Sequence, residues 1–354
     1  MVQNKALIFS QVPDGWPVAG THLVVEDRPI DLAQPLAPGA ILIKNYYASF
    51  DPYQRGRMRA PEKKSYSPPY DLDAPITNSC IFKVVRSAND KFREGDTLKS
   101  RGTTPIEEYT VLAKDQADQC YPLDNPYQLD LKYFLGPLGM PGLTAWSSLY
   151  EIGQPKPGET IFISAASGAV GQLVGQLAKH EGLRVIGSVG SDDKLALITD
   201  ELGFDAGFNY KTEKPADALA RLAPAGIDIY YENVGGEQLE AAINAMNNFG
   251  RIVACGMISQ YNARPAEAYP IRNLMQFVAK RLTMRGFIVG DDNMGPKHYR
   301  EHQEKLQKWL ADGSFKAKIS VTEGIDNAAH GFIGMLEGKN VGKAVLQIAE
   351  LNQA

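Results

Sequence analysis

Cysteine is scarce in this chain of 354 residues: Cys80, Cys120 and Cys255 are the only three, and they lie far apart. Three separated cysteines cannot build a disulfide framework, and they cannot supply a four-cysteine zinc site. Free thiols are typical of a reducing compartment, so we expect a cytoplasmic protein.

Runs of basic residues are also missing. The chain has 37 Lys and Arg against 41 Asp and Glu, which gives a formal net charge of −4. A protein that binds nucleic acid normally carries a basic stripe that neutralises phosphates. We therefore expect no nucleic-acid partner.

Long apolar runs are lacking as well. The N-terminal segment, MVQNKALIFS, has no apolar core of the kind that a secretory signal needs. The most apolar stretch, residues 161–178, is rich in Gly, Ala and Ser and stops at Lys179. This pattern indicates a strand, a turn and a helix, not a membrane span, so we expect no membrane partner.

In the first third of the chain, short runs of β-branched and aromatic residues alternate with clusters of Pro, Gly and Asp. Runs bounded in this way are typical of strands in an all-β unit. The predicted strands are Lys5–Phe9, Ile41–Tyr47, Ile81–Val85 and Glu108–Leu112.

From about residue 130, apolar strands alternate with amphipathic helices, an order typical of a parallel, doubly wound sheet. The predicted strands are Thr160–Ala165, Arg184–Val189, Ile227–Glu232, Arg251–Cys255 and Leu282–Val289, and the main helix is Ala169–His180. A polar helix, His298–Asp312, precedes a tail that returns to strands. We predict an α/β fold in which residues 131–295 are inserted into a β-rich domain of residues 1–130 and 296–354.

The turn after the first of these parallel strands carries a dinucleotide-type motif, Ile161-Phe-Ile-Ser-Ala165-Ala-Ser-Gly168-Ala-Val-Gly171. Gly168 lets a backbone approach a pyrophosphate closely, and Gly171 lets the helix pack tightly on the sheet. The N–H groups at the helix start then face the phosphates. Small residues at such a turn also occur for packing alone, but the flanking strand and helix favour a nucleotide site.

The end of the second parallel strand indicates which dinucleotide binds. NAD sites usually carry an acid about 20 residues beyond the glycines. This chain has Gly190 and Ser191 there, with Lys194 one helical turn later. Lys194 can pair with a 2′-phosphate, the alternative being a solvated surface lysine, and Asp192 and Asp193 argue mildly against the phosphate. The strand context favours NADP as the cofactor.

Further short motifs occur along nearly the whole chain. Several are weak when taken singly, but their order and spacing together are specific for one protein family. They are residues 49–58 (SFDPYQRGRM), 107–110, 138–145, 165–171, 187–191 with Lys194, 208–211, 232–236, 255–262, 286–289 and 340–343. In these segments the chain resembles the zinc-independent medium-chain dehydrogenase/reductases, in the branch of leukotriene hydroxydehydrogenase/prostaglandin reductase and the alkenal double-bond reductases. The resemblance implies a Rossmann domain inserted into a GroES-like β-rich domain, with NADPH or NADP as the cofactor.

The resemblance also implies roles for individual residues. The pyrophosphate would lie against Ser167, Gly168, Ala169, Val170 and Gly171. The 2′-phosphate would be bound by Ser191, Lys194 and Tyr210. The ribose and diphosphate would follow Asn233 and a loop of Cys255, Gly256, Met257, Ile258, Ser259 and Tyr261. The nicotinamide would be flanked by Phe287, Ile288 and Val289, with Asn340 contacting the cofactor from the tail.

Two departures from related proteins bear on substrate and metal. The branch usually has a Gly-Tyr-Gly-like element where this chain has Ser79-Cys80-Ile-Phe82, so we expect a pocket tyrosine to be replaced near Cys80. Zinc alcohol dehydrogenases of the wider superfamily need a Gly-His-Glu element and cysteine ligands. This chain has neither, and its five histidines show no ligand spacing, so we expect no metal.

The leading hypothesis is reduction of a carbon–carbon double bond conjugated to a carbonyl, in a small enal or enone. Hydride would reach the β-carbon, and the carbonyl oxygen would need a donor as negative charge develops on it. Tyr261 is the first candidate donor and Tyr47 the second, although Tyr261 packing on the cofactor and Tyr47 packing in the core remain alternatives. An NADPH quinone reductase and a non-catalytic NADPH-binding protein are the other hypotheses. The resemblance further implies a homodimer formed through the strand near Leu282–Val289.

Overall fold

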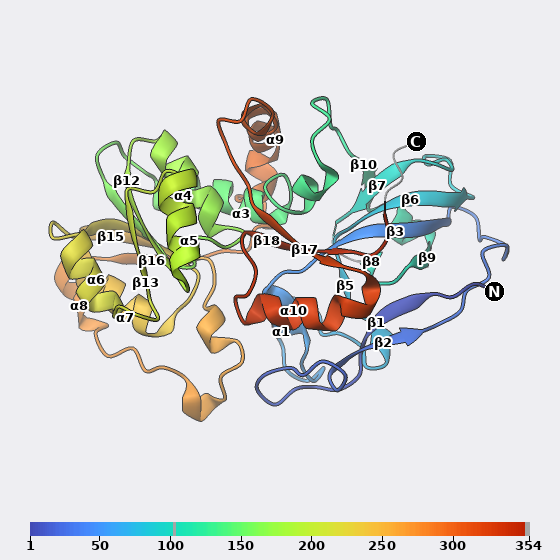
Figure 1. The fold of residues 1–354 in the computed structure, drawn as a ribbon, viewed down its shortest axis with the longest axis horizontal. Helices are drawn as coiled ribbons and strands as arrows, with labels where there is room; N and C mark the ends of the chain where they lie inside the picture. The colour runs from blue at the N-terminus through green and yellow to red at the C-terminus, as the bar shows by residue number, and fades with distance from the viewer. Residues whose placement is uncertain (102–103, 351–354) are drawn as a thin grey trace. The chain divides into compact units, whose positions relative to one another are not determined.

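The computed structural model describes residues 1–101 and 104–350, which form two compact units. Unit 1 contains residues 1–135, 319–340 and the segment from 344 onward. Unit 2 contains residues 136–318 and 341–343. Unit 1 therefore combines both ends of the chain, and strand β18 (Lys343–Gln347) near the C-terminus lies beside β3 (Ile41–Ser49) near the N-terminus (Figure 1).

Unit 1 is rich in antiparallel strands, as the sequence predicts. Its largest sheet runs β10-β7-β6-β3-β18-β17, with β9 also paired to β3. The strands of this sheet are β3 (Ile41–Ser49), β6 (Cys80–Ser87), β7 (Thr97–Ser100), β9 (Tyr109–Leu112), β10 (Cys120–Pro122), β17 (Ile319–Glu323) and β18 (Lys343–Gln347).

The smaller elements of unit 1 complete this domain. One small sheet contains β1 (Lys5–Phe9), β2 (Leu23–Asp27) and β4 (Ala74–Pro75), and another pairs β5 (Thr77–Asn78) with β8 (Thr104–Pro105). The helices are α1 (Tyr53–Arg57), α2 (Lys114–Ala117) and α10 (Ala328–Leu336).

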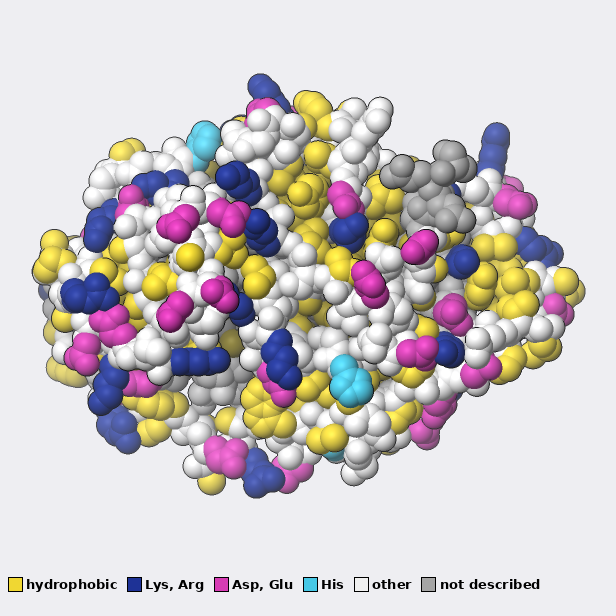
Figure 2. Space-filling model, in the orientation of Figure 1, with side chains coloured by type: hydrophobic (Ala, Val, Ile, Leu, Met, Phe, Trp, Pro, Cys, Tyr) yellow, Lys and Arg dark blue, Asp and Glu magenta, His cyan; other side chains and the backbone are white. Residues whose placement is uncertain are grey.

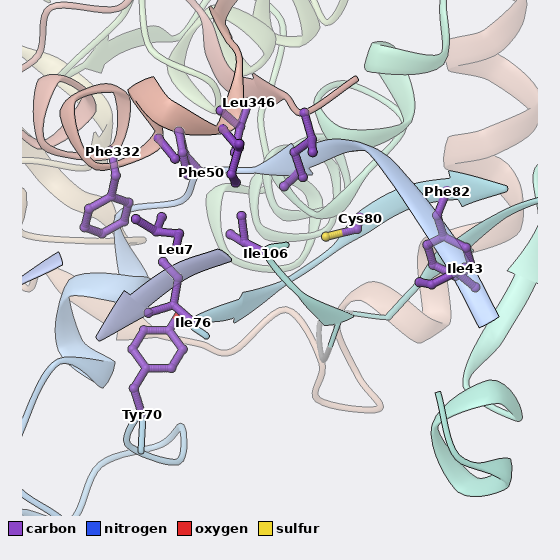
Figure 3. Packing of buried hydrophobic residues seen from close by; sticks show 14 of the residues in the cluster. Leu7, Ile43, Phe50, Tyr70, Ile76, Cys80, Phe82, Ile106, Phe332 and Leu346 are labelled. Atoms are coloured by element: carbon purple, nitrogen blue, oxygen red, sulfur yellow. The ribbon is translucent and has the colours of Figure 1, made fainter. Parts of the chain in front are cut away.

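The core of unit 1 is formed by apolar side chains from strands that lie far apart in the sequence. Figure 3 shows Leu7 of β1, Phe82 of β6 and Leu346 of β18 in one cluster with Phe332 of α10. Cys80 belongs to the same cluster and is fully buried. Contacts between the two chain ends therefore stabilise this unit by removing apolar surface from water.

Unit 2 contains a six-stranded, wholly parallel sheet in the order β13-β12-β11-β14-β15-β16. Numbered from its first strand, this is the 3-2-1-4-5-6 order of the Rossmann fold. The prediction of a doubly wound parallel sheet is confirmed. The strands are β11 (Thr160–Ile163), β12 (Arg184–Val189), β13 (Ala206–Asn209), β14 (Ile227–Glu232), β15 (Met246–Ala254) and β16 (Thr283–Gly286).

Helices connect these strands because parallel strands need crossover segments. On one sheet face, Phe162, Phe208 and Tyr230 stack and pack with residues of α6 and α7. The helices of unit 2 are α3 (Met140–Ser148), α4 (Gly171–His180), α5 (Asp192–Ala196), α6 (Pro215–Leu222), α7 (Gly236–Ala245), α8 (Met275–Lys280) and α9 (Gly295–Ala311).

The long polar helix α9 lies within unit 2, whereas the sequence-based boundary at residue 296 assigned it to the β-rich domain. Its His302 is fully buried, contacts Trp146 of α3 edge-on, and has Nε2 2.9 Å from the Pro137 carbonyl oxygen. These contacts explain why the division in the structure falls after residue 318. The first division in the structure falls between residues 135 and 136.

One predicted strand is too long. The sequence predicts Leu282–Val289, but β16 ends at Gly286. Beyond it the chain turns: the N–H of Gly295 donates to the Val289 carbonyl at 2.9 Å, and a Cβ on Gly295 would lie 2.4 Å from that oxygen. Phe287, Ile288 and Val289 therefore lie in a loop that leads to α9.

The surface agrees with the balanced composition. On the face shown in Figure 2, Lys and Arg side chains are interspersed with Asp and Glu side chains. Within the described ranges, none of the helices combines the length and the apolar character that a membrane span requires.

Candidate functional site

The turn between β11 and α4 has the shape of a phosphate-binding loop. Ala165 has a φ of +48°, a left-handed conformation that usually favours glycine. A Cβ on Gly171 would lie 2.4 Å from the Ala165 carbonyl oxygen, so this position cannot carry a larger side chain without moving the backbone. Gly168 is also tight, with its added Cβ 3.1 Å from the same oxygen.

The donors of this turn fit a pyrophosphate. Among the described residues, the backbone N–H groups of Val170 and Gly171 have no hydrogen-bond acceptor, whereas Ala169 adjoins the bridge between Gly168 and Gly342. The first turn of α4 contains no acidic residue, and no side chain caps the helix. Unpaired N–H groups at the positive end of a helix are suited to an anion. Ser167 is buried beside them, and its carbonyl accepts from Gly342 at 2.8 Å.

At the end of β12, the residues expected to select NADP come together. A Cβ on Gly190 would lie 2.9 Å from Tyr210 Oη, so the absence of a side chain leaves room for the tyrosine ring. Ser191 caps α5 by accepting the Lys194 N–H at 3.4 Å. Burial lowers the pKa of the half-buried Lys194, and the nearby Lys211 lowers it further. Two cations in this position fit a 2′-phosphate.

Beneath this edge lies a buried polar network that the sequence analysis did not assign to the site. Glu232, at the end of β14, is fully buried, and its Oε1 accepts from Tyr230 Oη at 2.9 Å. The same oxygen accepts the N–H groups of Val234 and Gly235 at 2.6 and 2.8 Å. Burial raises the pKa of Glu232 despite these hydrogen bonds. The available signal was a second acid, at the carboxyl end of a mostly buried strand.

Asn233 is held by the neighbouring strand. Its Nδ2 donates to the Ser164 carbonyl at 2.8 Å, and its N–H donates to Ser164 Oγ at 2.9 Å. These two bonds join the carboxyl ends of β11 and β14. The loop residues around Asn233 are therefore fixed before any ligand binds, as electrostatic preorganisation requires.

The loop after β15 is fixed in the same way. The N–H groups of Cys255 and Gly256 donate to the Glu232 carbonyl at 3.0 Å, and Ile258 donates to the Asn233 carbonyl at 3.1 Å. Ser259 donates to the Val234 carbonyl at 3.0 Å. Met257 is half-buried and packs on the sheet core. Burial raises the pKa of the Cys255 thiol to about 12, so this cysteine is not a reactive thiolate.

Tyr261 follows the short helix Ile258–Gln260 and lies over the same edge of the sheet. A Cβ on Gly256 would come within 2.8 Å of Tyr261 Oη. The glycine therefore makes room for the phenol at the carboxyl end of β15. Because the strands are parallel, this end lies on the same edge as the phosphate loop.

The remaining predicted residues lie elsewhere. Phe287 and Val289 are half-buried in the loop after β16, and Ile288 is 41% exposed. Tyr47 and Asn340 belong to unit 1. Tyr47 lies in β3, is 8% exposed, and has its ring 5.1 Å from Lys132 Nζ.

Cys80 lies in the core of unit 1, and the expected replacement of a pocket tyrosine near it stays a prediction. Its side chain packs in the core of unit 1, with Sγ 3.7 Å from the Asn78 carbonyl and 3.9 Å from the Thr104 carbonyl. The thiol therefore fills a core position.

Comparison with known proteins agrees with this architecture. Residues 169–308 match the family described as zinc-binding dehydrogenase, and residues 5–119 match the N-terminal domain of oxidoreductase. The NADP-dependent oxidoreductase RED1 of Cochliobolus heterostrophus is 56% identical, with 99% of each chain covered. The NADP(+)-dependent 2-alkenal reductase of Nicotiana tabacum is 40% identical, with 98% of each covered. The crystal structure of CurA in complex with NADPH from Vibrio vulnificus has a TM-score of 0.87 at 35% identity, covering 98% of this chain and all of that one.

The Rossmann sheet and the preformed anion loop, together with these relatives, place the chain among the dinucleotide-dependent oxidoreductases. The chain belongs to the zinc-independent medium-chain dehydrogenase/reductases, in the alkenal reductase branch. The family description mentions zinc, but within residues 1–101 and 104–350 no three His, Cys, Asp or Glu side chains are grouped to hold a metal ion.

Proposed function

We propose that this protein reduces the carbon–carbon double bond of α,β-unsaturated aldehydes or ketones with NADPH. When bound, NADPH supplies the hydride, which adds to the β-carbon of the substrate, and water supplies the proton that adds to the α-carbon. The cofactor assignment is supported by Lys194 in α5, which follows β12, by the nearby Lys211 in the turn after β13, and by the NADP-dependent relatives.

The observation that carries the proposal is the position of the Tyr261 phenol over Gly256. As the double bond is reduced, negative charge develops on the carbonyl oxygen of the substrate. A hydrogen-bond donor can stabilise that charge without a metal. Tyr261 supplies such a donor at the edge of the sheet where the dinucleotide loop lies. Tyr47 is the second candidate, although its burial and the nearby Lys132 favour a packing role.

The first experiment follows the loss of NADPH absorbance with a panel of enals, enones and quinones, and repeats each reaction with NADH. Fast consumption with enals or enones and NADPH supports the proposal. Consumption with quinones alone assigns the protein as a quinone reductase. NADPH binding without turnover on any substrate makes it a non-catalytic binding protein.

Tyr261→Phe tests the donor. The loss of one oxyanion donor should lower kcat roughly 10–1000-fold at saturating NADPH. Tyr269→Phe is the matched control, because its phenol donates to Glu240 at 2.5 Å and takes no part in the proposed reaction. If Tyr261→Phe turns over at the wild-type rate, the donor role passes to Tyr47, which Tyr47→Phe then tests.

We further propose that the protein is cytoplasmic and forms a homodimer. The cytoplasmic location is supported by the three cysteines, all of which are free thiols. The dimer is supported by the exposed edge of the parallel sheet at β16. Cell fractionation tests the first proposal, and the dimer is tested by the mass measurement described below.

A further inference from the structure

Helix α4 presents two glutamines, one turn apart, to the extended segment 316–318 in unit 2. Gln172 Oε1 accepts the N–H of Lys318 at 2.8 Å, and Gln172 Nε2 donates to the Lys318 carbonyl at 3.1 Å. Gln176 makes the same pair of hydrogen bonds to Lys316, both at 2.8 Å. Each glutamine therefore pairs with the backbone of one residue as a neighbouring strand would.

The spacing explains why the two pairs form together. Four residues of α-helix rise about 6 Å. Two residues of extended chain advance about 6.6 Å, and alternate residues point their N–H and C=O groups to the same side. Glutamines at i and i+4 on a helix therefore match residues k and k+2 of an adjacent extended segment. Here the matched residues are Gln172 with Lys318 and Gln176 with Lys316.

The two glutamine–lysine pairs differ in their further contacts, because only the pair of Gln172 with Lys318 is linked to the phosphate loop. The Lys318 carbonyl also accepts the N–H of Lys343 at 3.0 Å. The next residue back, Gly342, donates its N–H to Ser167 in the phosphate loop at 2.8 Å and forms a bridge with Gly168. Gln172 itself is 1% exposed and directly follows Gly171. The Gln172 pair is thus linked to the phosphate loop through residues 342 and 343.

Gly342 is fitted to this contact. It has a φ of +68°, and a Cβ there would lie 1.9 Å from the Lys318 carbonyl oxygen and 2.9 Å from Gln172 Nε2. Glycine is therefore required both by the backbone conformation and by the close approach of the Lys318 carbonyl and the Gln172 side chain. Hydrogen bonds therefore run from Gln172 to Lys318, from Lys318 to Lys343, and from the adjacent Gly342 back to Ser167 in the phosphate loop.

We propose that Gln172 is a positioning residue for cofactor binding, which holds residues 341–343 against the phosphate loop through Lys318. This inference rests on the proposed binding of NADPH at that loop. Gln172 does not touch the reacting atoms. It fixes the Ser167 carbonyl and the adjoining loop backbone, so that the N–H groups of residues 169–171 are ordered before the pyrophosphate arrives.

The test compares Gln172→Met with Gln176→Met. Both variants lose the pair of hydrogen bonds to segment 316–318, and Gln176→Met also loses the bond from Nε2 to the Gln172 carbonyl, so both should lower the free energy of unfolding. Gln172→Met should raise the Kd for NADPH, measured by fluorescence titration, about 10-fold, because it leaves the partly buried Lys318 N–H unpaired next to residues 342 and 343. Gln176→Met should leave that Kd unchanged. In steady-state assays Gln172→Met should raise KM for NADPH and keep kcat.

Hydrogen exchange gives a second readout. The amides of Gly342 and Lys343 should lose protection in Gln172→Met and keep it in Gln176→Met. If Gln172→Met does not fold, Gly342→Ala probes the same contact from the tail and should raise the Kd for NADPH. Gly338→Ala is its control, because Gly338 has a similar φ of +70° but no atom within 4 Å of an added Cβ.

The outcomes separate this inference from the proposed function. A wild-type protein that does not bind NADPH contradicts the proposed function. A wild-type protein that binds it, with a Gln172→Met variant of equal affinity, overturns the positioning role alone. An equal rise in Kd for both glutamine variants also overturns it, because the effect would then follow from lost stability.

Discussion

Lys194 is half-buried at the start of α5, and both its burial and the neighbouring Lys211 lower its pKa. Both effects disfavour its protonated form in the absence of a ligand. A 2′-phosphate beside the two lysines would reverse this by adding negative charge. The side chain is therefore suited to an anion that NADPH carries and NADH lacks.

The predicted consequence is a loss of cofactor preference. Lys194→Ala should raise KM for NADPH about 10–100-fold, since a hydrogen bond to a charged group contributes about 1.5–3 kcal/mol. KM for NADH should not change. Lys214→Ala, at an exposed lysine in the same unit, serves as the control. Equal losses with both cofactors in Lys194→Ala would contradict a 2′-phosphate contact.

At the scale of single residues, the need for a glycine could be predicted from the sequence only where the glycine belongs to a known loop motif. Gly171 was predicted to need its small size, and the structure shows why. Gly190 and Gly256 make room for Tyr210 and Tyr261, and no local pattern announces such contacts. The left-handed φ of Ala165 is likewise invisible in the sequence, because alanine rarely adopts it.

At the scale of elements, Glu232 connects three strands. Its carbonyl accepts from the loop after β15, its side chain accepts from the loop after β14, and Ser164 Oγ at the end of β11 donates to its Oε1 at 3.3 Å. Burial raises its pKa above the ordinary 4.5. The folded state therefore holds the proton more tightly than the unfolded state does.

This shift sets the sign of a pH dependence. Between the unfolded and the folded pKa, the folded state binds more protons, so the free energy of unfolding falls as pH rises. The contribution is complete below about pH 4.5 and is lost as pH rises through the folded pKa. Glu232→Gln removes it. The stability of the variant relative to wild type should therefore increase as pH rises above about 4.5 in urea titrations.

Glu240→Gln on α7 is the control with the opposite sign. Its pKa is lowered, first by the Tyr269 phenol and then by the Arg272 N–H, so its contribution is present above the unfolded pKa and lost as pH falls. This variant should lose stability relative to wild type as pH rises. If Glu232→Gln also loses stability relative to wild type as pH rises, the inference that folding raises the pKa of Glu232 is contradicted.

The elements that the sequence predicted well share a strong local signal. β1, β12 and β14 have the predicted bounds, because short apolar runs end at turn residues. The two-residue strands β4 and β5 were not predicted, since their pairing depends on partners elsewhere in the chain. The hydrogen bonds of Gln172 and Gln176 to segment 316–318 could not be predicted for the same reason. They join residues about 140 positions apart in the sequence.

At the scale of the whole molecule, β16 is an edge strand. It pairs with β15 on one side, and no strand within the described residues covers its other side. Most residues of β16 are exposed. No residue of α8, which lies next to β15, is buried. Leu274, Met275 and Val278 are 60%, 71% and 67% exposed. An exposed edge strand beside apolar side chains is a surface that natural proteins normally cover.

A second copy of the chain can cover this surface through a two-fold axis, because each copy presents the same edge and the same apolar side chains. Light scattering after size exclusion should therefore give twice the chain mass of 38.7 kDa. Val278→Asp should shift the mass towards that of one chain, since it places a charge in the apolar contact. Val18→Asp, at a valine that is 52% exposed in unit 1, should leave the dimer intact. A monomeric wild type would contradict the dimer, and a Val278→Asp dimer would place the interface on another surface.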